Sequence, residues 1–334
     1  MILLSAPHDL VDSNIYIDLQ PVLGWPVILK CEGLNFGGSV KMRVAAAMVV
    51  AAGEDGLLRE DSVLIESSSG NFGLALSVIA ASMELPFVCV TDCRCNELTV
   101  AAMRAYGTEV VVIDEPDPDG GYLKARLEWV RRRRAEDERY VWLDQYSNEA
   151  NWRAHYEGMA PAILRDFPDI DVLFAGVGTG GTAMGCARYL SDVGCKARVV
   201  AIDPEGSVSF GHEAGRRLIP GLGAGIRPPA LDATLFDDVV RVSELDTIRT
   251  CRALARRGLL FGGSTGTAVS GALSWLACHD PRAELRSVCI SADLGERYLD
   301  TVYNDAWVLE SYGLDALSPL PVAPPGNRSR VESR

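Results

Sequence analysis

The chain has 334 residues, 48% of them hydrophobic and 23% charged, which is an ordinary globular composition with room for two domains. The formal net charge of −13 disfavours nucleic-acid binding, which requires a basic surface, but it does not exclude anionic small molecules, because local fields decide their binding. The N-terminus lacks the basic flank of a signal peptide and no apolar run is long enough for a transmembrane helix, so we expect a cytoplasmic protein.

Short β-branched runs alternate with helical patterns along the chain. The nearly continuous apolar character of these runs is typical of a parallel sheet covered on both faces. The expected strands are Val27–Glu32, Val63–Glu66, Phe87–Thr91, Val110–Ile113, Val172–Ala175, Val199–Ile202 and Val288–Ser291. The expected helices between them include Arg43–Ala52, Gly73–Ser82, Thr99–Tyr106, Tyr122–Arg134 and Thr182–Leu190. The alternation predicts an α/β fold with open twisted sheets flanked by helices.

The first glycine-marked junction between a strand and a helix carries a lysine. Lys41 follows Gly37-Gly38-Ser39-Val40 and precedes an Ala- and Val-rich stretch. The electropositive field at a helix N-terminus favours a free amine over an ammonium, and a free amine can form a Schiff base. We therefore expect Lys41 to be catalytic.

The second junction is rich in hydroxyl groups. Ser67, Ser68, Ser69, Gly70 and Asn71 follow an expected strand and open an expected helix. Hydroxyls, backbone amides and the Asn amide at a helix N-terminus form a good carboxylate receptor. The alternative is simple N-capping of the helix by Ser69 or Asn71, and the two roles are compatible.

The third junction is a glycine-rich loop. Gly178, Thr179, Gly180, Gly181 and Thr182 can turn successive N–H groups toward an anion, which suits a phosphate monoester. The loop lacks the Walker lysine and the G-x-G-x-x-G spacing, which disfavours a nucleoside triphosphate and a dinucleotide. The alternative is a plain structural turn. In open α/β sheets, ligands bind at the carboxyl ends of the strands, where all three loops fall.

Three further features of the sequence bear on binding. Asp293 leaves the last expected strand where a cofactor ring can lie, or else it caps the following helix. Cys93 and Cys95 have no second pair or histidine cluster beside them, so we expect no metal site. Arg131–Arg134 is an anion patch or a solvated helix end, and the second interpretation is favoured.

Together these motifs resemble the fold-type II pyridoxal-phosphate enzymes of the cysteine synthase / cystathionine β-synthase family. The similarity covers most of the chain and includes the loops Gly223-Ala224-Gly225 and Gly262–Gly266. It implies a tryptophan-synthase-β-like fold and pyridoxal 5′-phosphate as the cofactor. It implies that the cofactor is bound by the following residues: Lys41, Asn71, Gly178, Thr179, Gly180, Gly181, Thr182 and Asp293.

The resemblance also implies a domain organisation. We expect a larger cofactor-phosphate-binding domain of residues 1–36 and 149–315, and a smaller mobile substrate-binding domain of residues 37–148. The Pro-rich tail, residues 316–334, is predicted to be disordered. A homodimer is expected.

Within that family, several segments resemble the N-(2-amino-2-carboxyethyl)-L-glutamate synthases: Asp114–Leu123, Asp144–Trp152, Arg297–Asp300 and Val302–Trp307. Those enzymes join O-phospho-L-serine to L-glutamate by β-replacement through an aminoacrylate. The reaction is the first step toward 2,3-diaminopropionate for siderophores and peptide antibiotics.

The implied substrate-binding residues follow from the chemistry of the two substrates. Ser68, Ser69, Gly70 and Asn71 would hold the α-carboxylate. A phosphate dianion is costly to desolvate without a cation, and Arg126 and Arg227 are the candidates, with Tyr146 as a hydrogen-bond donor. The alternatives are surface arginines and a packing tyrosine.

One departure from the family and two rival functions remain. Asp293 stands where many members have Ser, and it would keep the pyridine nitrogen protonated, although a neighbouring residue can also take that place. The rivals are a cysteine synthase that uses sulfide and an inactive cofactor-binding subunit with a regulatory role.

Overall fold

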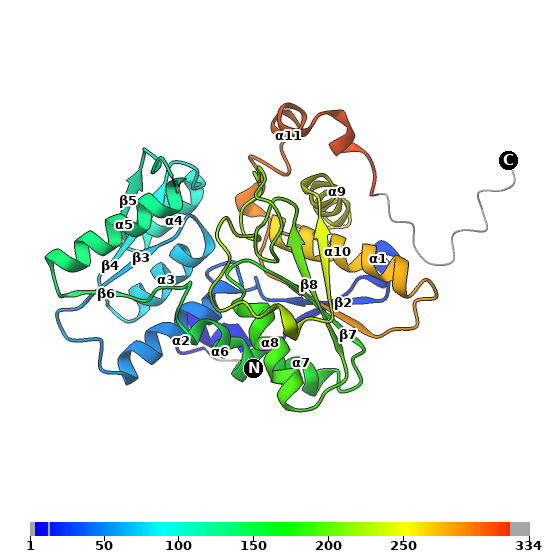
Figure 1. The fold of residues 1–334 in the computed structure, drawn as a ribbon, viewed down its shortest axis with the longest axis horizontal. Helices are drawn as coiled ribbons and strands as arrows, with labels where there is room; N and C mark the ends of the chain where they lie inside the picture. Colours follow the sequence, from blue (N-terminus) through cyan, green and yellow to red (C-terminus); the bar gives the residue numbers. More distant parts are fainter. Residues whose placement is uncertain (1–3, 13, 120, 321–334) are drawn as a thin grey trace, which may run out of the picture. The chain divides into compact units, whose positions relative to one another are not determined.

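The computed structural model describes residues 4–12, 14–119 and 121–320, and its contacts divide the chain into two compact units. Unit 1 holds the described residues up to Asp12 together with Leu34–Ala154, and unit 2 holds Asn14–Gly33 and the described residues from His155 onward (Figure 1).

The N-terminal segment differs from the predicted division, which assigns residues 1–36 to the larger domain. The buried Arg43 of unit 1 donates hydrogen bonds of 2.9 Å to Asp12 Oδ1 and to the carbonyl oxygen of Val11. These bonds fasten the segment to unit 1.

Unit 2 contains a six-stranded sheet with the order β1-β2-β10-β7-β8-β9. Every pairing is parallel except that of β1 with β2. The strands are β1 (Tyr16–Asp18), β2 (Val27–Cys31), β7 (Val172–Gly176), β8 (Arg198–Pro204), β9 (Asp238–Val242) and β10 (Ser287–Ser291).

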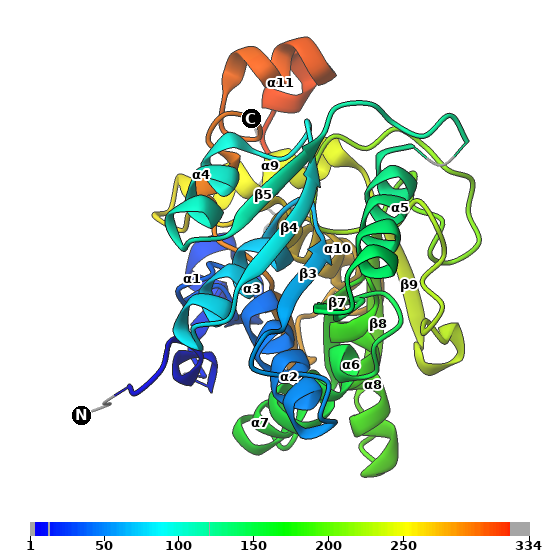
Figure 2. The same cartoon turned by 90° about the vertical axis from the view of Figure 1, so that its left-hand side faces the viewer.

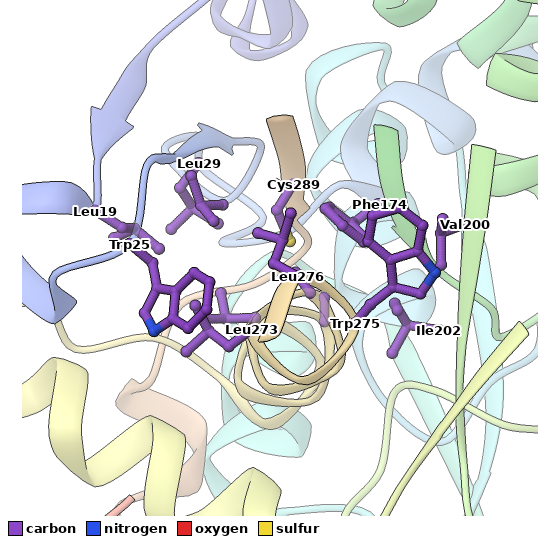
Figure 3. Packing of buried hydrophobic residues seen from close by; sticks show 14 of the residues in the cluster. Leu19, Trp25, Leu29, Phe174, Val200, Ile202, Leu273, Trp275, Leu276 and Cys289 are labelled. Atoms are coloured by element: carbon purple, nitrogen blue, oxygen red, sulfur yellow. The ribbon is translucent and has the colours of Figure 1, made fainter. Parts of the chain in front are cut away.

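Helices α8 (Gly181–Asp192) and α10 (Gly263–His279) pack on this sheet. The other helices of unit 2 are α1 (Gln20–Leu23), a π-helix (His155–Met159), α7 (Ala160–Asp166), α9 (Glu244–Ala255) and α11 (Asp305–Tyr312). Short 3₁₀ helices span Ala233–Leu235, Glu296–Tyr298 and Leu314–Leu317. Figure 3 shows Leu273, Trp275 and Leu276 of α10 packed against Phe174 and Cys289 of the sheet.

Unit 1 contains a four-stranded parallel sheet with the order β5-β4-β3-β6. The strands are β3 (Val63–Ser67), β4 (Phe87–Asp92), β5 (Glu109–Ile113) and β6 (Tyr140–Trp142). The helices are a 3₁₀ helix (Pro7–Asp12), α2 (Lys41–Glu54), α3 (Asn71–Ser82), α4 (Glu97–Ala105), α5 (Gly121–Glu136) and α6 (Ala150–Ala154).

Strand alternation divides the core of unit 1 into two layers. Leu64 and Cys89 pack with residues of α2 and α3, whereas their neighbours Ile65 and Val88 pack with Val130 of α5. Successive side chains of a strand point to opposite faces, so one sheet supports both layers. Figures 1 and 2 show α3 and α5 on opposite sides of β3 and β4.

The predicted α/β class with two helix-flanked sheets is confirmed, and each predicted strand and helix forms. Strands β1, β6 and β9 were not predicted. The first two have three residues each, and β9 carries Asp238 and Arg241, which interrupt its apolar pattern.

The prediction of a disordered tail from residue 316 is wrong for its first residues. Ala316 is fully buried and belongs to a 3₁₀ helix, and Leu320 packs against the core of unit 2. The remainder of that tail, 321–334, lies outside the described residues. Among the helices that the structure describes, none is long and apolar enough to cross a membrane.

Candidate active site

Lys41 is the first residue of α2, and the loop before it is held by a side chain. Asn35 Oδ1 accepts a hydrogen bond from Gly37 N, and Asn35 Nδ2 donates to the carbonyl oxygen of Ser39, both at 3.0 Å. These bonds brace the turn from which the helix starts, as an Asx turn does. The position of Lys41 in unit 1 therefore follows from the local sequence.

The Lys41 amine lies in a protein environment without an acceptor. The side chain is half-buried, and its Nζ has no hydrogen-bond or ion-pair partner among the residues that the structure describes. Burial disfavours the ammonium and lowers the pKa of Lys41 to about 8. An amine with this pKa is unprotonated in about one molecule in ten at pH 7, far more often than an ordinary lysine, and a nucleophile or proton acceptor requires the unprotonated form.

The loop between β3 and α3 presents two free side chains. Ser68 Oγ accepts hydrogen bonds from Gly73 N at 2.9 Å and from Gly70 N at 3.3 Å, so Ser68 caps the helix, not Ser69 or Asn71 as the alternative interpretation supposes. Ser69 is exposed and Asn71 half-buried, and within the described ranges neither side chain has a partner. Both remain available to a ligand.

The glycine-rich loop of unit 2 joins β7 to α8. Gly180 has φ +90°, a left-handed conformation that L side chains rarely adopt, and a Cβ on Gly178 would lie 2.9 Å from the carbonyl oxygen of Gly221. The loop therefore requires glycine at both positions. Helix α8 begins at Gly181, so the free N–H groups of its first turn adjoin the loop.

Asp293 lies at the end of β10 in unit 2 and is fully buried. Its Oδ1 accepts hydrogen bonds from Thr265 N at 3.2 Å and from Thr265 Oγ1 at 3.1 Å, and its Oδ2 accepts one from the Tyr298 hydroxyl at 2.5 Å. Burial raises the pKa of Asp293 although these hydrogen bonds oppose the rise. Asp293 thus braces the first turn of α10 and holds the side chain of Tyr298, but it does not cap the 3₁₀ helix that follows it in sequence.

The carboxyl group of Asp293 is only partly compensated by a cation, because the positive charge of Arg297 opposes the rise of the Asp293 pKa without forming an ion pair with it. No Lys or Arg among the described residues lies within ion-pair distance of its carboxyl group. A buried carboxylate is stable only when it is paired or protonated. The site therefore fits a ligand that brings a positively charged N–H group.

Arg126 lies in unit 1 and is buried, which contradicts the alternative of a surface arginine. Its Nε is 3.3 Å from Oδ2 of the fully buried Asp92, and within the described residues its Nη1 is buried without a hydrogen-bond partner. Tyr146 is half-buried in the same unit. Burial raises the pKa of Tyr146 while the positive charge of Arg126 opposes the rise, so the two groups interact.

Arg227 lies in unit 2 and is exposed. Among the described residues its guanidinium group has no hydrogen-bond or ion-pair partner. Of the two candidate arginines, only Arg126 is already desolvated. Arg126 would therefore interact more strongly with a dianion than the solvent-exposed Arg227.

Sequence reasoning did not identify Glu66 as a group of interest. Glu66 is fully buried at the end of β3, where Oε1 accepts hydrogen bonds from Ser67 N at 2.8 Å and from Trp142 Nε1 at 3.1 Å. Burial raises the pKa of Glu66 to about 8. Thr265 and Tyr298 were also missed, because no local pattern connects them to Asp293.

The residues present fit pyridoxal 5′-phosphate in three respects. Lys41 supplies an amine without an acceptor, the loop from Gly178 supplies a glycine-built anion site, and Asp293 supplies a buried carboxylate without an ion pair among the described residues. No group of three or more potential metal ligands occurs in the portion of the chain that the structure describes.

Comparison with known proteins gives a consistent result. The sequence profile of a family described as pyridoxal-phosphate-dependent enzymes matches residues 16–293. A solved hydrogen sulfide-producing enzyme from Fusobacterium nucleatum is 32% identical with a TM-score of 0.82, and the match covers 90% of this chain and 99% of that chain.

Two solved structures of O-ureido-L-serine synthase are also similar. One is 31% identical with a TM-score of 0.82, and the match covers 92% of this chain and 99% of that chain. The other, a lysine-to-alanine mutant with O-ureido-L-serine bound, is 30% identical with a TM-score of 0.83, covering 92% of this chain and 98% of that chain.

Proposed function

The chain belongs to the pyridoxal-phosphate-dependent enzyme family, and from that premise we propose that it replaces the phosphate of O-phospho-L-serine with the amine of L-glutamate. The product is N-(2-amino-2-carboxyethyl)-L-glutamate, a precursor of 2,3-diaminopropionate for siderophores or peptide natural products. β-Replacement is the reaction type of this enzyme, and the choice of the two substrates is the proposal.

The observation that carries the proposal is the burial of Arg126. A phosphate dianion that leaves water requires a charged partner, and Arg126 has a buried Nη1 without a partner in the described part of the chain. Asp92 compensates the charge through Nε, but a buried guanidinium nitrogen without a hydrogen-bond partner is still costly, so a role for it is expected. A pocket for acetyl or other neutral leaving groups would not require this cation.

Four elements would hold the cofactor. Lys41 would attach it through the side-chain amine, the loop Gly178–Thr182 would bind its phosphate, Asp293 would pair with the pyridine nitrogen, and Asn71 would hold the ring hydroxyl. When bound, the cofactor supplies an electron sink for negative charge at the substrate Cα. Ionised Asp293 is a stronger partner for a pyridinium N–H than a serine hydroxyl is.

Lys41 also carries the proton in the chemical steps. Its Nζ removes the proton from the substrate Cα and later returns it to the same carbon. Ser68, Ser69, Gly70 and Asn71 hold the α-carboxylate, which fixes the Cα–H bond relative to Nζ. Orientation of this kind can supply several kcal/mol, roughly 7 or more in favourable cases.

The remaining substrate groups are assigned by charge. Arg126 and Tyr146 bind the phosphate that leaves from Cβ, since one is a desolvated cation and the other a hydrogen-bond donor. Arg227, which is exposed, attracts the carboxylates of the incoming glutamate. The glutamate amine then forms the new bond to Cβ.

The second candidate function is cysteine synthesis from sulfide. The likeness to a hydrogen sulfide-producing enzyme supports sulfur chemistry in a related chain. The third candidate, an inactive cofactor-binding subunit, is disfavoured because Lys41 and both ligand loops are intact. We further propose a cytoplasmic homodimer, which light scattering on the purified protein can test.

The decisive experiment offers each donor and each nucleophile separately. O-phospho-L-serine or O-acetyl-L-serine is incubated with the enzyme and either glutamate or sulfide, and the products are identified by mass spectrometry. The proposal expects the glutamate adduct from O-phospho-L-serine. Cysteine from sulfide without any glutamate adduct would instead support the second candidate.

Two arginine variants separate the roles of the two substrates. Arg126→Lys keeps a charge beside Asp92 but loses the planar guanidinium, so we expect KM for O-phospho-L-serine to rise about 10-fold while KM for glutamate changes little. Arg227→Gln should raise KM for glutamate only. Identical effects of both variants on both substrates would contradict the assignment.

A further inference from the structure

His155 occupies an unusual position in unit 2. It is fully buried and is the first residue of the π-helix His155–Met159, which directly follows α6 in the chain. The π-helix packs against α8, the helix that the glycine-rich loop opens. Single π-helical turns are rare and occur frequently at functional sites, because they turn one side chain out of the regular helical register.

The contact that His155 makes is with the second residue of α8. His155 Nε2 is 3.2 Å from Thr182 Oγ1. Thr182 is half-buried, and its hydroxyl group has no other hydrogen-bond partner among the residues described. The hydroxyl group can both donate and accept a hydrogen bond. The bond with His155 uses one of these two roles, so the other is left for a ligand of the loop.

The direction of this hydrogen bond decides what the loop can bind. If Thr182 donates to Nε2, the hydroxyl presents only lone pairs to a ligand, which repel a phosphate. If Nε2–H donates to Oγ1, the hydroxyl hydrogen is free to point toward the loop. The free N–H groups of the first turn of α8 are donors, so a donating hydroxyl extends the same set.

We propose that His155 is a positioning residue for the cofactor phosphate. It keeps Nε2 protonated toward Thr182 Oγ1 and thereby turns the Thr182 hydroxyl hydrogen to a phosphate oxygen. His155 itself does not touch the phosphate. The inference rests on the proposed placement of the phosphate in the loop Gly178–Thr182, but not on the identity of either substrate.

A double-mutant cycle in the full-length chain tests the inference. The variants are His155→Phe, Thr182→Val and the combination of the two, with His155→Gln and Thr182→Ser as conservative controls. The readouts are the dissociation constant for pyridoxal 5′-phosphate and the ³¹P chemical shift of the bound phosphate. Thermal unfolding without cofactor reports separately on packing, because His155 is buried.

We expect His155→Phe and Thr182→Val each to weaken cofactor binding about 10-fold, the size of one hydrogen bond to a charged group, and to shift the ³¹P resonance. His155→Gln retains a donor nitrogen, so it should stay within about 3-fold of the wild type. In the Thr182→Val background, His155→Phe should have no further effect, because its effect passes through the missing hydroxyl group.

Two outcomes would overturn the inference, and only the second would also contradict the proposed phosphate site. In the first outcome, His155→Phe leaves the ³¹P shift and the affinity unchanged while Thr182→Val changes them clearly. The phosphate would then still bind in the loop, but His155 would have only a packing role. If neither His155→Phe nor Thr182→Val changed the affinity or the ³¹P shift, the proposal that the loop binds the phosphate would also be wrong. Neither result depends on whether glutamate is the nucleophile.

Discussion

The Tyr298 hydroxyl lies 2.5 Å from Oδ2 of Asp293, and both residues are buried in unit 2. The bond joins a 3₁₀ turn to the end of β10, and Thr265 of α10 holds the other oxygen of the same carboxyl group. The two side chains fix the orientation of Asp293, which would limit the reorganisation that binding a ligand requires.

Replacing Tyr298 by Phe should remove the shortest of these bonds. The hydrogen bond favours the ionised carboxyl group, so its loss raises the pKa of Asp293 further. We expect the free energy of unfolding to fall by about 1–2 kcal/mol, with the larger loss at high pH, where Asp293 is ionised. Chemical denaturation at several pH values measures both effects.

Tyr189→Phe serves as the matched control, since no hydrogen bond of the Tyr189 hydroxyl joins it to the described residues. That variant should stay within about 0.5 kcal/mol of the wild type. Equal losses in the two variants would show that the Tyr298 hydroxyl does not hold Asp293.

Gly262→Ala should disturb Asp293 by steric contact. A Cβ at Gly262 would lie 2.4 Å from Asp293 Cγ, and fully packed surroundings leave little space for relief. We expect a loss of about 1–3 kcal/mol in stability. Gly53→Ala in α2 is the control, because the nearest atom to its Cβ is 4.0 Å away, and alanine there should be neutral or stabilising. Thermal unfolding compares the stabilities of the two variants. An unchanged stability of Gly262→Ala would contradict the predicted steric contact with Asp293.

Glu66 should make stability depend on pH. Its pKa is about 8 in the folded state against 4.5 as the ordinary value, so between these values the folded protein keeps a proton that the unfolded chain releases. The free energy of unfolding therefore falls as pH rises through this window. Glu66→Gln keeps an oxygen that accepts from Trp142 and Ser67 but does not ionise, so it should reduce this fall by at least about 1 kcal/mol.

The control for this prediction is Glu60→Gln, which removes an exposed carboxylate from the same unit. Urea denaturation between pH 5 and pH 9, roughly the window set by the two pKa values, gives the slopes. If the stability of Glu66→Gln depended on pH as the stabilities of Glu60→Gln and the wild type do, Glu66 would be excluded as the source of the pH dependence.

Lys41→Ala should abolish covalent attachment of pyridoxal 5′-phosphate. Borohydride treatment followed by peptide mass spectrometry detects the attached lysine, and Lys196→Ala, which removes an exposed lysine, should retain the modification. Because only the free amine reacts, the attachment rate in the wild type should rise with pH and level off above about 8, the pKa of Lys41. Modification of another lysine in Lys41→Ala at the wild-type rate would contradict the assignment.

The arrangement of sheets and helices was predictable because it depends on local patterns. Runs such as Val172–Gly176 have an apolar character that a buried parallel strand requires, and the helix start at Lys41 follows from the preceding glycines. The exceptions are β9, whose apolar pattern is interrupted by charged residues, and the short strands at Tyr16 and Tyr140, which have three residues each. Segments of this length carry too little periodicity to be distinguished from loops.

The supporting contacts were not predictable from local patterns. Thr182 and His155 are 27 positions apart, Asp293 and Thr265 are 28 apart, and Trp142 and Glu66 are 76 apart. Hydrogen bonds over such separations depend on how helices and strands pack, and the sequence alone contains no spacing that marks them. Histidines that are scattered along the chain therefore gave no sign that one of them contacts the glycine-rich loop.

The amino-acid sequence by itself determined the α/β class, the three loops between strands and helices and the place of Lys41, because glycines, hydroxyls and apolar runs act over a few neighbouring residues. Only the tertiary structure distinguished Arg126 from Arg227, two arginines that each follow a glycine-containing segment. One is buried beside Asp92 and the other is exposed to solvent. Burial sets the cost of a charge and hence its strength toward a ligand, and burial is a property of contacts between distant segments.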